Sequence, residues 1–592
     1  MATSLNFDSL VIDGSGRASF SGLSSGIDLQ KAVDGLIAAK RLPIDRIEQR
    51  ISRNQVKIAA FQDLRARALN LKSALDKLRG VPTLDRSGDI FEAKQAFATA
   101  TRADAQTPSE AEAIVGVAVT NRSQAASHTL EVQQIAAAHK VASDSIAGAL
   151  EAALGQSGTF LIHGRAIAVD SSDSLLDLRD AINAANAGDD ATGVTASIVS
   201  ISAAEHVLIL TADDTGTAAT ISAADAGGAV LQSLGLLDGG GAFKNELQAG
   251  QNAELLVDGL GTVIERPSNT VDDVVGGVTL SLFKAEPGTI IKLDVERDLN
   301  RVKSAIVDFV DAYNELRGLI NQQALTSVPE DDETGAGALA GTSALSEIRA
   351  RLSAAIGGAV HGGDATLTVL AQVGITLRSP SAAADPLLAN TLDVDQTKLD
   401  DALLNRIDAV RELFAFRMSS SSPDVVLLGF DRDTRYSASG YQLNVAYAGG
   451  AITSANLGGA ADGSDDGSIS VKGNVLTVVA GPAKGLKLLF TGAAPASGVQ
   501  IGLSIGLGAQ IYHAADALAD ETSGMIASEI DSLEGQNELG AARLERLEER
   551  LDRERERLLE RFIAMETALA TMQRLLESLR QQIDAAFGDR RN

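Results

Sequence analysis

Residues 543–583, RLERLEERLDRERERLLERFIAMETALATMQRLLESLRQQI, carry the pattern that decides the fold. Apolar residues recur at steps of three, four or seven positions, which is typical of a helix with one apolar stripe. Charges of both signs occupy the other positions, as on a solvated coiled-coil surface. The stripe consists of Leu544, Leu547, Leu551, Leu558, Phe562, Met565, Leu569, Met572, Leu576, Leu579 and Ile583, with a four-residue stutter between Leu558 and Phe562.

The N-terminal end of the chain has the same character. Leu29, Val33, Leu36 and Ile37 are spaced as on a short helix, which we expect to end near Pro43. A second, longer helix should follow, with a polar Asn54 on its otherwise apolar seam. Its apolar positions are Ile44, Ile47, Ile51, Ile58, Phe61, Leu64, Ala68, Leu71, Leu75 and Leu78.

These two ends need apolar partners, because a stripe of this length would otherwise be a large exposed apolar surface. Two arrangements satisfy the need. The ends could pack on each other as an ordinary internal bundle, or they could reach neighbouring subunits. Their position at the two extremities of the chain favours assembly with other subunits.

Composition excludes several classes of function. The 592 residues include no cysteine, so disulfides, thiolate metal sites and thiol catalysis are excluded. The net charge of -27 comes from the middle of the chain, since neither end has more acidic than basic residues. An acidic middle argues against nucleic acid as a partner. No apolar stretch long enough for membrane insertion and no cleavable secretory signal are visible.

The middle of the chain alternates between strand-like and helical patterns. In 278–282, Val278, Leu280 and Leu282 alternate with Thr279 and Ser281, as in a sheet with one buried face. We therefore predict an α+β multidomain fold, with terminal coiled-coil-like helices and a helical stalk that carries inserted antiparallel β-rich head domains. The expected regions are a docking helix region (1–42) that pairs with 545–592, a stalk helix (43–107), β-rich heads (108–297), a helical return (298–426), an additional β-rich domain (427–510), a helical stalk segment (511–544) and a C-terminal coiled-coil helix (545–592).

One motif raises the alternative of a serine hydrolase. Gly22–Gly26 formally matches G-x-S-x-G, with Ser24 as the nucleophile before a helix. Such an enzyme needs several parallel strands around this turn, and only about twenty small and polar residues precede it. It also needs a histidine base, and the six histidines lie in no recognisable setting. We interpret Gly22–Gly26 as a hinge before a docking helix.

The remaining motifs give no site for a metal or cofactor. DGSDDG at 462–467 resembles the start of a calcium-binding loop, but Gly473 stands where a bidentate glutamate is required. No phosphate-binding loop and no metal-spaced pair of histidines is present. We therefore predict no catalytic residue, no cofactor and no metal, and a structural or binding protein.

Several stretches resemble one family in the same order along the chain. They are FSGLSSGIDLQKAVDGLIAAKRLPIDRIEQRISRNQVKIAAFQDLRARALNLKSALDKL (20–78), HTLEVQQIAAAHKVAS (128–143), FLIHGRAIAVDSSDSLLDLRDAINAAN (160–186), AELLVDGLGTVIERPSNTVDDVVGGVTLSL (253–282) and ERFIAMETALATMQRLLESL (560–579). Together they resemble the flagellar filament-cap family, also called flagellar hook-associated protein 2. Two features depart from the family pattern: the block at about 427–510 looks additional, and Thr342 replaces an expected acidic residue.

The resemblance implies a homo-oligomeric cap at the distal tip of the bacterial flagellum, outside the cell. It implies export through the flagellar type III apparatus without a cleaved signal, with an export chaperone, and contacts with flagellin and hook-filament junction proteins. A flagellin or hook-filament junction protein remains the alternative within the same class. We expect self-assembly and filament docking to use Ile27, Leu29, Val33, Leu36, Ile37, Leu558, Phe562, Met565, Leu569, Met572, Leu576, Leu579 and Ile583.

Overall fold

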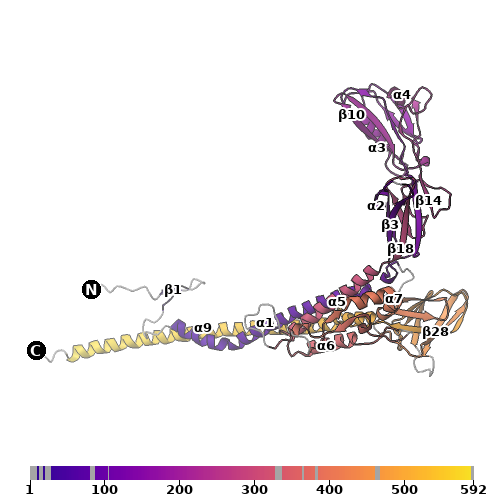
Figure 1. The fold of residues 1–592 in the computed structure, drawn as a ribbon. Coiled ribbons are helices and arrows are strands. Elements are labelled where there is room, and N and C mark those ends of the chain that lie inside the picture. Colours follow the sequence, from indigo (N-terminus) through magenta and orange to yellow (C-terminus); the bar gives the residue numbers. More distant parts are fainter. Residues whose placement is uncertain are drawn as a thin grey trace. The chain divides into compact units, whose positions relative to one another are not determined.

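The computed structural model describes residues 10–12, 18–20, 29–80, 87–104, 106–326, 337–362, 366–380, 385–431, 433–459 and 467–587. The chain divides into two compact units (Figure 1). The helical unit contains residues 1–79, 306–402 and 409–592, and the head unit contains residues 80–305 and 403–408. Each unit has its own buried core, so the predicted α+β multidomain class is confirmed.

Two long helices dominate the helical unit, and their apolar seams follow the sequence pattern. α1 (Leu29–Asp76) packs against α9 (Met525–Phe587) and against α8 (Leu507–Ala519). The α1 seam predicted from the sequence is buried or half-buried along its length, and Leu64, Leu71 and Leu75 have no exposed surface. Burial of such a stripe stabilises helices far more than intrinsic propensity does.

The predicted helix break at Pro43 is wrong, because α1 continues through this residue. Proline inside a helix removes one backbone hydrogen bond and costs about 3 kcal/mol or more. The next turn offsets this cost, since Ile44 is 1% exposed and Ile47 is 8% exposed. Burying two isoleucine side chains stabilises by about 1.5–3 kcal/mol each. Tertiary packing therefore overrides the local signal.

The remaining helices complete the helical unit. α5 buries Phe309 and Tyr313, and Phe309 packs edge-to-face on Phe414 at the end of α7, with 6.0 Å between ring centroids. Thr342, which departs from the family pattern, caps α6 by accepting a hydrogen bond from the backbone N–H of Leu345. The bounds are α5 (Leu299–Gln323), α6 (Ser343–Ile356), α7 (Gln396–Phe414), and the short 3-10 helices η3 (Leu370–Val373) and η4 (Pro386–Leu388).

The additional β-rich domain belongs to the helical unit and is a sheet that curls back toward itself. Its eight strands follow the order β21-β28-β23-β24-β25-β26-β27-β22. The first and last strands in this order are consecutive in the chain and touch each other, and Phe416 stacks on Phe430 with ring centroids 3.7 Å apart. The strands are β21 (Phe416–Ser420), β22 (Val425–Gly429), β23 (Tyr441–Ala448), β24 (Ala451–Gly459), β25 (Gly467–Lys472), β26 (Val475–Val478), β27 (Lys487–Phe490) and β28 (Ala496–Ile505).

Two small antiparallel pairs also belong to the helical unit. β19 (Ile375–Leu377) pairs with β20 (Leu392–Val394), and β1 (Leu10–Ile12) pairs with β2 (Ala18–Phe20). The strand before Gly22–Gly26 thus has an antiparallel neighbour. Ser24 itself, Ile27 and the acidic loop at 462–466 lie outside the described residues.

The head unit contains two β-rich blocks with separate cores. The first block is built from two sheets, with orders β15-β14-β5-β18-β3 and β16-β17-β4. In β17 the predicted alternation is confirmed, because Val278, Leu280 and Leu282 are buried. The elements are η1 (Ile90–Glu92), β3 (Lys94–Arg102), α2 (Ala111–Ile114), β4 (Val115–Val119), β5 (Ala126–Gln134), β14 (Ala253–Val257), β15 (Ile264–Arg266), β16 (Thr270–Val271), β17 (Val278–Leu282) and β18 (Thr289–Arg297).

The second block is inserted between β5 and β14 and packs helix α3 on its sheets. Ser174 caps α3 in a reciprocal capping box with Asp177, which fixes where the helix begins. The elements are β6 (Lys140–Ala142), β7 (Ile146–Ala147), β8 (Gly158–Ile162), β9 (Arg165–Val169), α3 (Leu175–Ala185), β10 (Val194–Ser202), β11 (Glu205–Ala212), η2 (Thr217–Ala219), β12 (Ala223–Gly227), α4 (Val230–Ser233) and β13 (Asn245–Gln248).

Several region borders differ from those expected. The head sheet already begins at Lys94, whereas the sequence placed the stalk helix up to residue 107. The additional domain spans 416–505 and not 427–510, because β21 closes its sheet. The C-terminal helix begins at Met525, so it runs across the predicted border at 544/545, while residues 511–519 belong to α8.

Candidate functional site

The candidate site is the pair formed by α1 and α9, which run antiparallel. Asn54 and Asn537 meet inside the pair, where the Asn54 Nδ2 donates to Asn537 Oδ1 at 2.9 Å. Asn54 is 6% exposed and Asn537 is half-buried, so this hydrogen bond lies within an otherwise apolar seam. A single polar pair of this kind sets the register of a coiled coil, because any shift leaves a buried amide without a partner.

A small residue allows the two helices to approach closely beside this pair. A Cβ atom placed on Gly540 would lie 3.2 Å from side-chain atoms of Ile51. Contact at this distance is tight, so a side chain at 540 would require the Ile51 side chain to move by a few tenths of an ångström. Gly540 is therefore a packing residue of the pair, and the sequence pattern did not single it out as one.

Two ion pairs link the N-terminal part of α1 to α9. Lys40 pairs with Glu554, and Arg555 donates to Asp34 with 2.9 Å between Nη2 and Oδ1. The hydrogen bond from Lys40 lowers the pKa of Glu554 below its ordinary value. Glu554 and Arg555 lie three and four residues after Leu551, where the apolar stripe would otherwise continue before Leu558. The charged residues thus interrupt the apolar stripe at this step.

Beyond this step the apolar stripe of α9 is first mostly half-buried and then, from Met572 onward, exposed. α1 begins at Leu29, whereas α9 continues to Phe587. Met572 is 60% exposed, Leu576 is 55% exposed and Ile583 is 52% exposed. We call residues 558–583 of α9 the distal stripe. Apolar side chains exposed along one face of a helix mark an interaction surface.

The structure divides the predicted docking residues into two groups. Val33 is fully buried, Ile37 is half-buried, and the side chain of Leu29 is not described. Leu36 is exposed on α1. In the distal stripe, Leu558, Phe562 and Leu569 are half-buried, and the exposed members are Met565, Met572, Leu576, Leu579 and Ile583.

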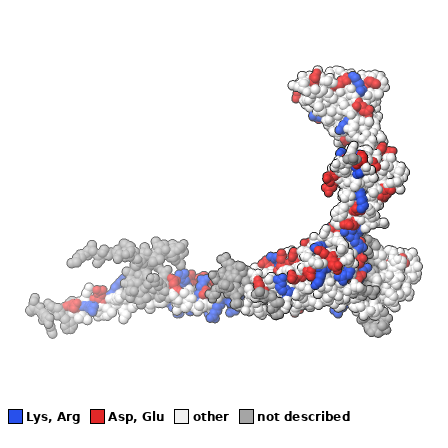
Figure 2. All heavy atoms as spheres, viewed as in Figure 1, with Lys and Arg blue, Asp and Glu red and all other residues white. Residues whose placement is uncertain are grey.

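A groove opens beside Pro43, between the two helices. Its cavity volume is about 450 Å³, and its walls come from both helices. Leu42, Leu547 and Leu551 supply apolar surface, while Lys40 and Arg550 place positive charge at the rim. Figure 2 shows charges of both signs interspersed along the visible part of these helices.

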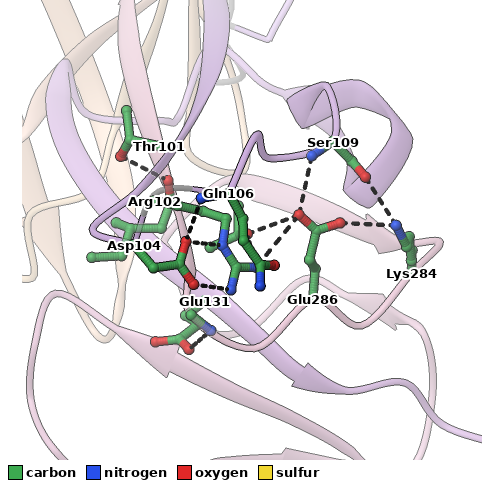
Figure 3. A network of polar contacts seen from close by, with 11 residues as sticks. Thr101, Arg102, Asp104, Gln106, Ser109, Glu131, Lys284 and Glu286 are labelled. Carbon is green, nitrogen blue, oxygen red and sulfur yellow. Dashed lines mark hydrogen bonds and ion pairs between the residues drawn. The ribbon is translucent and has the colours of Figure 1, made fainter.

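A cluster of charged residues in the head was a second candidate for chemistry (Figure 3). Arg102 at the end of β3 donates from Nε and Nη2 to Asp104, both at 2.8 Å, and from Nη1 to Thr289 Oγ1 at 3.0 Å. The bidentate bond lowers the pKa of Asp104 and raises that of Arg102. A bidentate ion pair of this kind is a strong hydrogen-bonded contact, and it also fixes the relative orientation of the two side chains.

Glu286 is the second centre of this cluster. It accepts from the Lys284 Nζ at 2.8 Å, from the backbone N–H of Ser109 at 3.0 Å and from the Thr289 hydroxyl at 2.8 Å. Hydrogen bonds from Lys284 and Ser109 hold the pKa of Glu286 far below its ordinary range. A carboxylate that is ionised and fully engaged is a poor general acid or base. The cluster therefore fastens the 104–109 segment to β18.

Other candidate chemistry finds little support in the described part of the chain. Those residues contain no group of three or more His, Asp or Glu placed to hold a metal ion. None of the described helices combines the length and apolar character needed to cross a bilayer. A groove of about 650 Å³ on the additional β-rich domain has six serines among its lining residues. It shows no nucleophile paired with a base.

The fold and the paired helices define a multidomain α+β protein whose long C-terminal helix exposes an apolar stripe. The chain belongs to the flagellar hook-associated protein 2 family. The family's C-terminal model matches residues 250–574, and its N-terminal model matches residues 25–139. A flagellin hook IN motif matches residues 154–214.

Individual relatives agree with this assignment. The A-type flagellar hook-associated protein 2 of Pseudomonas aeruginosa is 28% identical over 417 residues, which cover 66% of this chain and 79% of that protein. The flagellar hook-associated protein 2 of Escherichia coli K12 is 29% identical, over 64% of this chain and 77% of that protein. The crystal structure of the flagellar cap protein FliD D1-D2-D3 domains from Escherichia coli matches with a TM-score of 0.45 and 26% identity, over 60% of this chain and 89% of that one.

Proposed function

We propose that this chain is the structural cap at the distal tip of a bacterial flagellar filament, where it assembles as a homo-oligomer. Membership of the flagellar hook-associated protein 2 family carries the assignment to the filament cap. The distal stripe carries the assembly role, because most of its apolar side chains, from Met572 to Ile583 and at Met565, are exposed in the described chain. Docking uses Ile27, Leu29, Val33, Leu36 and Ile37 at the N-terminal end together with the distal stripe.

The cap promotes folding and insertion of flagellin beneath it and prevents loss of flagellin subunits into the medium. Its partners are therefore flagellin, the hook-filament junction proteins and sister copies of the chain. The protein works outside the cell and leaves through the flagellar type III export apparatus, with an export chaperone, and without a cleaved signal. The absence of cysteine suits this route, since an unfolded chain without thiols forms no disulfide on the way.

A complementation experiment tests the proposal. A strain without this gene should spill unpolymerised flagellin into the medium, and the wild-type chain should restore filaments. We expect Leu569→Asp to restore neither filament length nor flagellin retention, because a charge on the distal stripe cannot be buried against a partner. Thr571→Asp, on the opposite side of the same helix, is the matched control and should complement fully.

The same experiment separates the cap from its alternatives. Loss of a flagellin would leave no flagellin in the medium at all, whereas loss of a cap increases it. A serine hydrolase would lose its function with Ser24→Ala and would be labelled by a fluorophosphonate probe. Normal filaments from Leu569→Asp would contradict the assembly role.

A further inference from the structure

The groove on the additional β-rich domain opens where one neighbour of β28 stops. β21 pairs with β28 as far as Ile505, whereas the pairing of β23 with β28 stops at Ile501. Beyond Ile501 the outer surface of β28 therefore has β21 on one side and the 436–440 loop on the other, and both line the groove. Its volume of about 650 Å³ lies within the range of sites that hold small molecules.

A glycine keeps the floor of the groove open. Gly502 on β28 lies directly opposite Ser419 on β21, and both residues line the groove. A Cβ atom on Gly502 would lie 2.5 Å from the Ser419 hydroxyl oxygen, so a larger residue would displace this side chain and occupy the space beside it. The backbone at Gly502 is that of an ordinary strand, which any residue can adopt. The open space is therefore what this glycine supplies.

An aromatic side chain supplies one wall of the groove. Tyr436 lines it, and the Tyr436 ring stacks on His361 with 6.2 Å between ring centroids and 17° between ring planes. The loop is fastened beside it, because the Tyr441 hydroxyl donates to the carbonyl oxygen of Arg435 at 2.9 Å. Tyr436 nevertheless stays 38% exposed. A fixed and partly exposed aromatic ring loses little conformational entropy when a ligand packs on it.

Hydroxyl and amide groups supply polar surface around this ring. The hydroxyl oxygens of Ser437 and Ser439 are 3.1 Å apart, so one hydroxyl donates to the other. A hydroxyl can donate one hydrogen bond and accept two, so both keep hydrogen-bonding capacity for a ligand. The exposed side chain of Gln500 on β28 adds an amide. Groups that both donate and accept hydrogen bonds match a ligand that carries many hydroxyls.

The charges that line the groove balance each other. Glu412 and Arg417 are the charged members of the described lining, and they form an ion pair. A groove without net charge gives no advantage to a phosphate or a nucleic acid, since such ligands need uncompensated cations. Its many hydroxyls disfavour an apolar ligand, because their hydrogen bonds to water would be lost.

We propose that this groove is a binding site for a neutral saccharide. A sugar ring carries hydroxyls around its edge and C–H groups on its faces, and the partly positive hydrogens of these C–H groups pack well on the negative face of an aromatic ring. Tyr436 packs on such a face, while Ser437, Ser439 and Gln500 bond the hydroxyls. The inference goes beyond the proposed cap function and does not depend on it, because no residue of α1 or α9 lines the groove.

Binding of the full-length protein to a glycan array tests the proposal. The probes are neutral tetrasaccharides of hexoses, N-acetylhexosamines and deoxyhexoses, together with their sialylated and sulfated counterparts as charged probes. We expect saturable binding to at least one neutral probe, and titration calorimetry then measures its affinity. Tyr436→Ala should weaken this binding by about tenfold or more, because it removes the stacking surface.

Two further variants test the floor and the hydroxyls. Gly502→Leu fills the groove and should abolish measurable binding. Ser470→Leu, at an exposed position of β25 outside the groove, is the matched control and should bind like the wild type. The double variant Ser437→Ala with Ser439→Ala changes a surface loop and should weaken binding by about three- to tenfold. It decides the question if Gly502→Leu does not fold, as judged by its thermal transition in circular dichroism.

Other results would overturn the proposal. Absence of binding to every neutral probe would mean that the groove is no saccharide site. Binding to the charged probes alone would mean that the chain recognises an anion. Equal binding by the wild type, Tyr436→Ala and the double serine variant would place the saccharide elsewhere on the chain. None of these results bears on the cap function, which the complementation experiment tests separately.

Discussion

The two parts of α9 carry the same kind of apolar stripe but have different surroundings. In the first part, Ile526, Ile530 and Leu533 are buried and Asn537 bonds to Asn54. In the distal stripe, Met572, Leu576 and Ile583 are at least half exposed. The difference arises because the helices are antiparallel and α1 begins only at Leu29, so the last part of α9 extends past the beginning of α1. A repeat of apolar residues therefore reports that a helix needs a partner, and the length of the neighbouring elements decides which partner is available.

The largest effect is expected from truncating the covered seam. Leu64→Ala removes a side chain with no exposed surface and should destabilise the helical unit by about 2–5 kcal/mol. Its thermal transition, followed by the helical signal in circular dichroism, should shift to lower temperature. Leu569→Ala on the distal stripe is the comparison, and we expect a change within about 0.5 kcal/mol. Equal shifts in the two variants would mean that the distal stripe is covered within one chain.

The buried amide pair gives the next largest effect. Asn54→Leu leaves Asn537 without its partner and should cost about 1–3 kcal/mol. The double change Asn54→Leu with Asn537→Leu should recover most of this loss, since two apolar side chains can pack together. The recovered protein should have a less well-defined helix register, visible as faster amide hydrogen exchange in both helices. A double variant as unstable as the single one would argue against direct coupling of the two residues.

We expect the stability of the head unit to decrease at low pH, and this effect should not depend on either part of α9. Glu286 and Asp104 have lowered pKa values in the folded head, so their contribution to stability is complete above the unfolded pKa of about 4–4.5. It is lost progressively as pH falls from about 5 toward the folded pKa values. The melting temperature of the head should therefore drop between pH 7 and pH 3, and Glu286→Gln should flatten this dependence. Unchanged acid sensitivity in Glu286→Gln would place its cause elsewhere.

The smallest effect is expected at the border between the two parts of α9. Lys40 and Glu554 are both well exposed, and water and salt screen such pairs. Lys40→Ala should leave the thermal transition of the helical unit almost unchanged and should leave capping intact. A clear loss of capping in this variant would show that the charged step itself contacts a partner.

Much of the fold could be predicted from the sequence, where local patterns and burial agree. The seams of α1 and α9 and the alternation in β17 follow the apolar spacing, because the side that faces the core must be apolar. The break at Pro43 was wrong because burial of Ile44 and Ile47 together offsets the cost of proline inside the helix. The start of the additional domain was also missed, since β21 is recognised as part of it only by pairing with β28.

For the predicted docking residues too, the sequence pattern could not show which side chains are buried within the chain. The sequence pattern found the distal stripe, but it treated Val33 and Leu36 alike, and the structure buries one and exposes the other. Gly540 was not found at all, because a glycine in a helix gives no sign of a close helix contact without the partner in place.

The sequence by itself determined that both ends are long amphipathic helices, that no thiol chemistry is possible and that the chain resembles flagellar cap proteins. Only the tertiary structure decided where the intramolecular pairing stops. That point depends on the relative lengths of α1 and α9 and on the register set by Asn54 and Asn537, which are properties of contacts between residues far apart in the chain. Periodicity is a local property and carries no information about them.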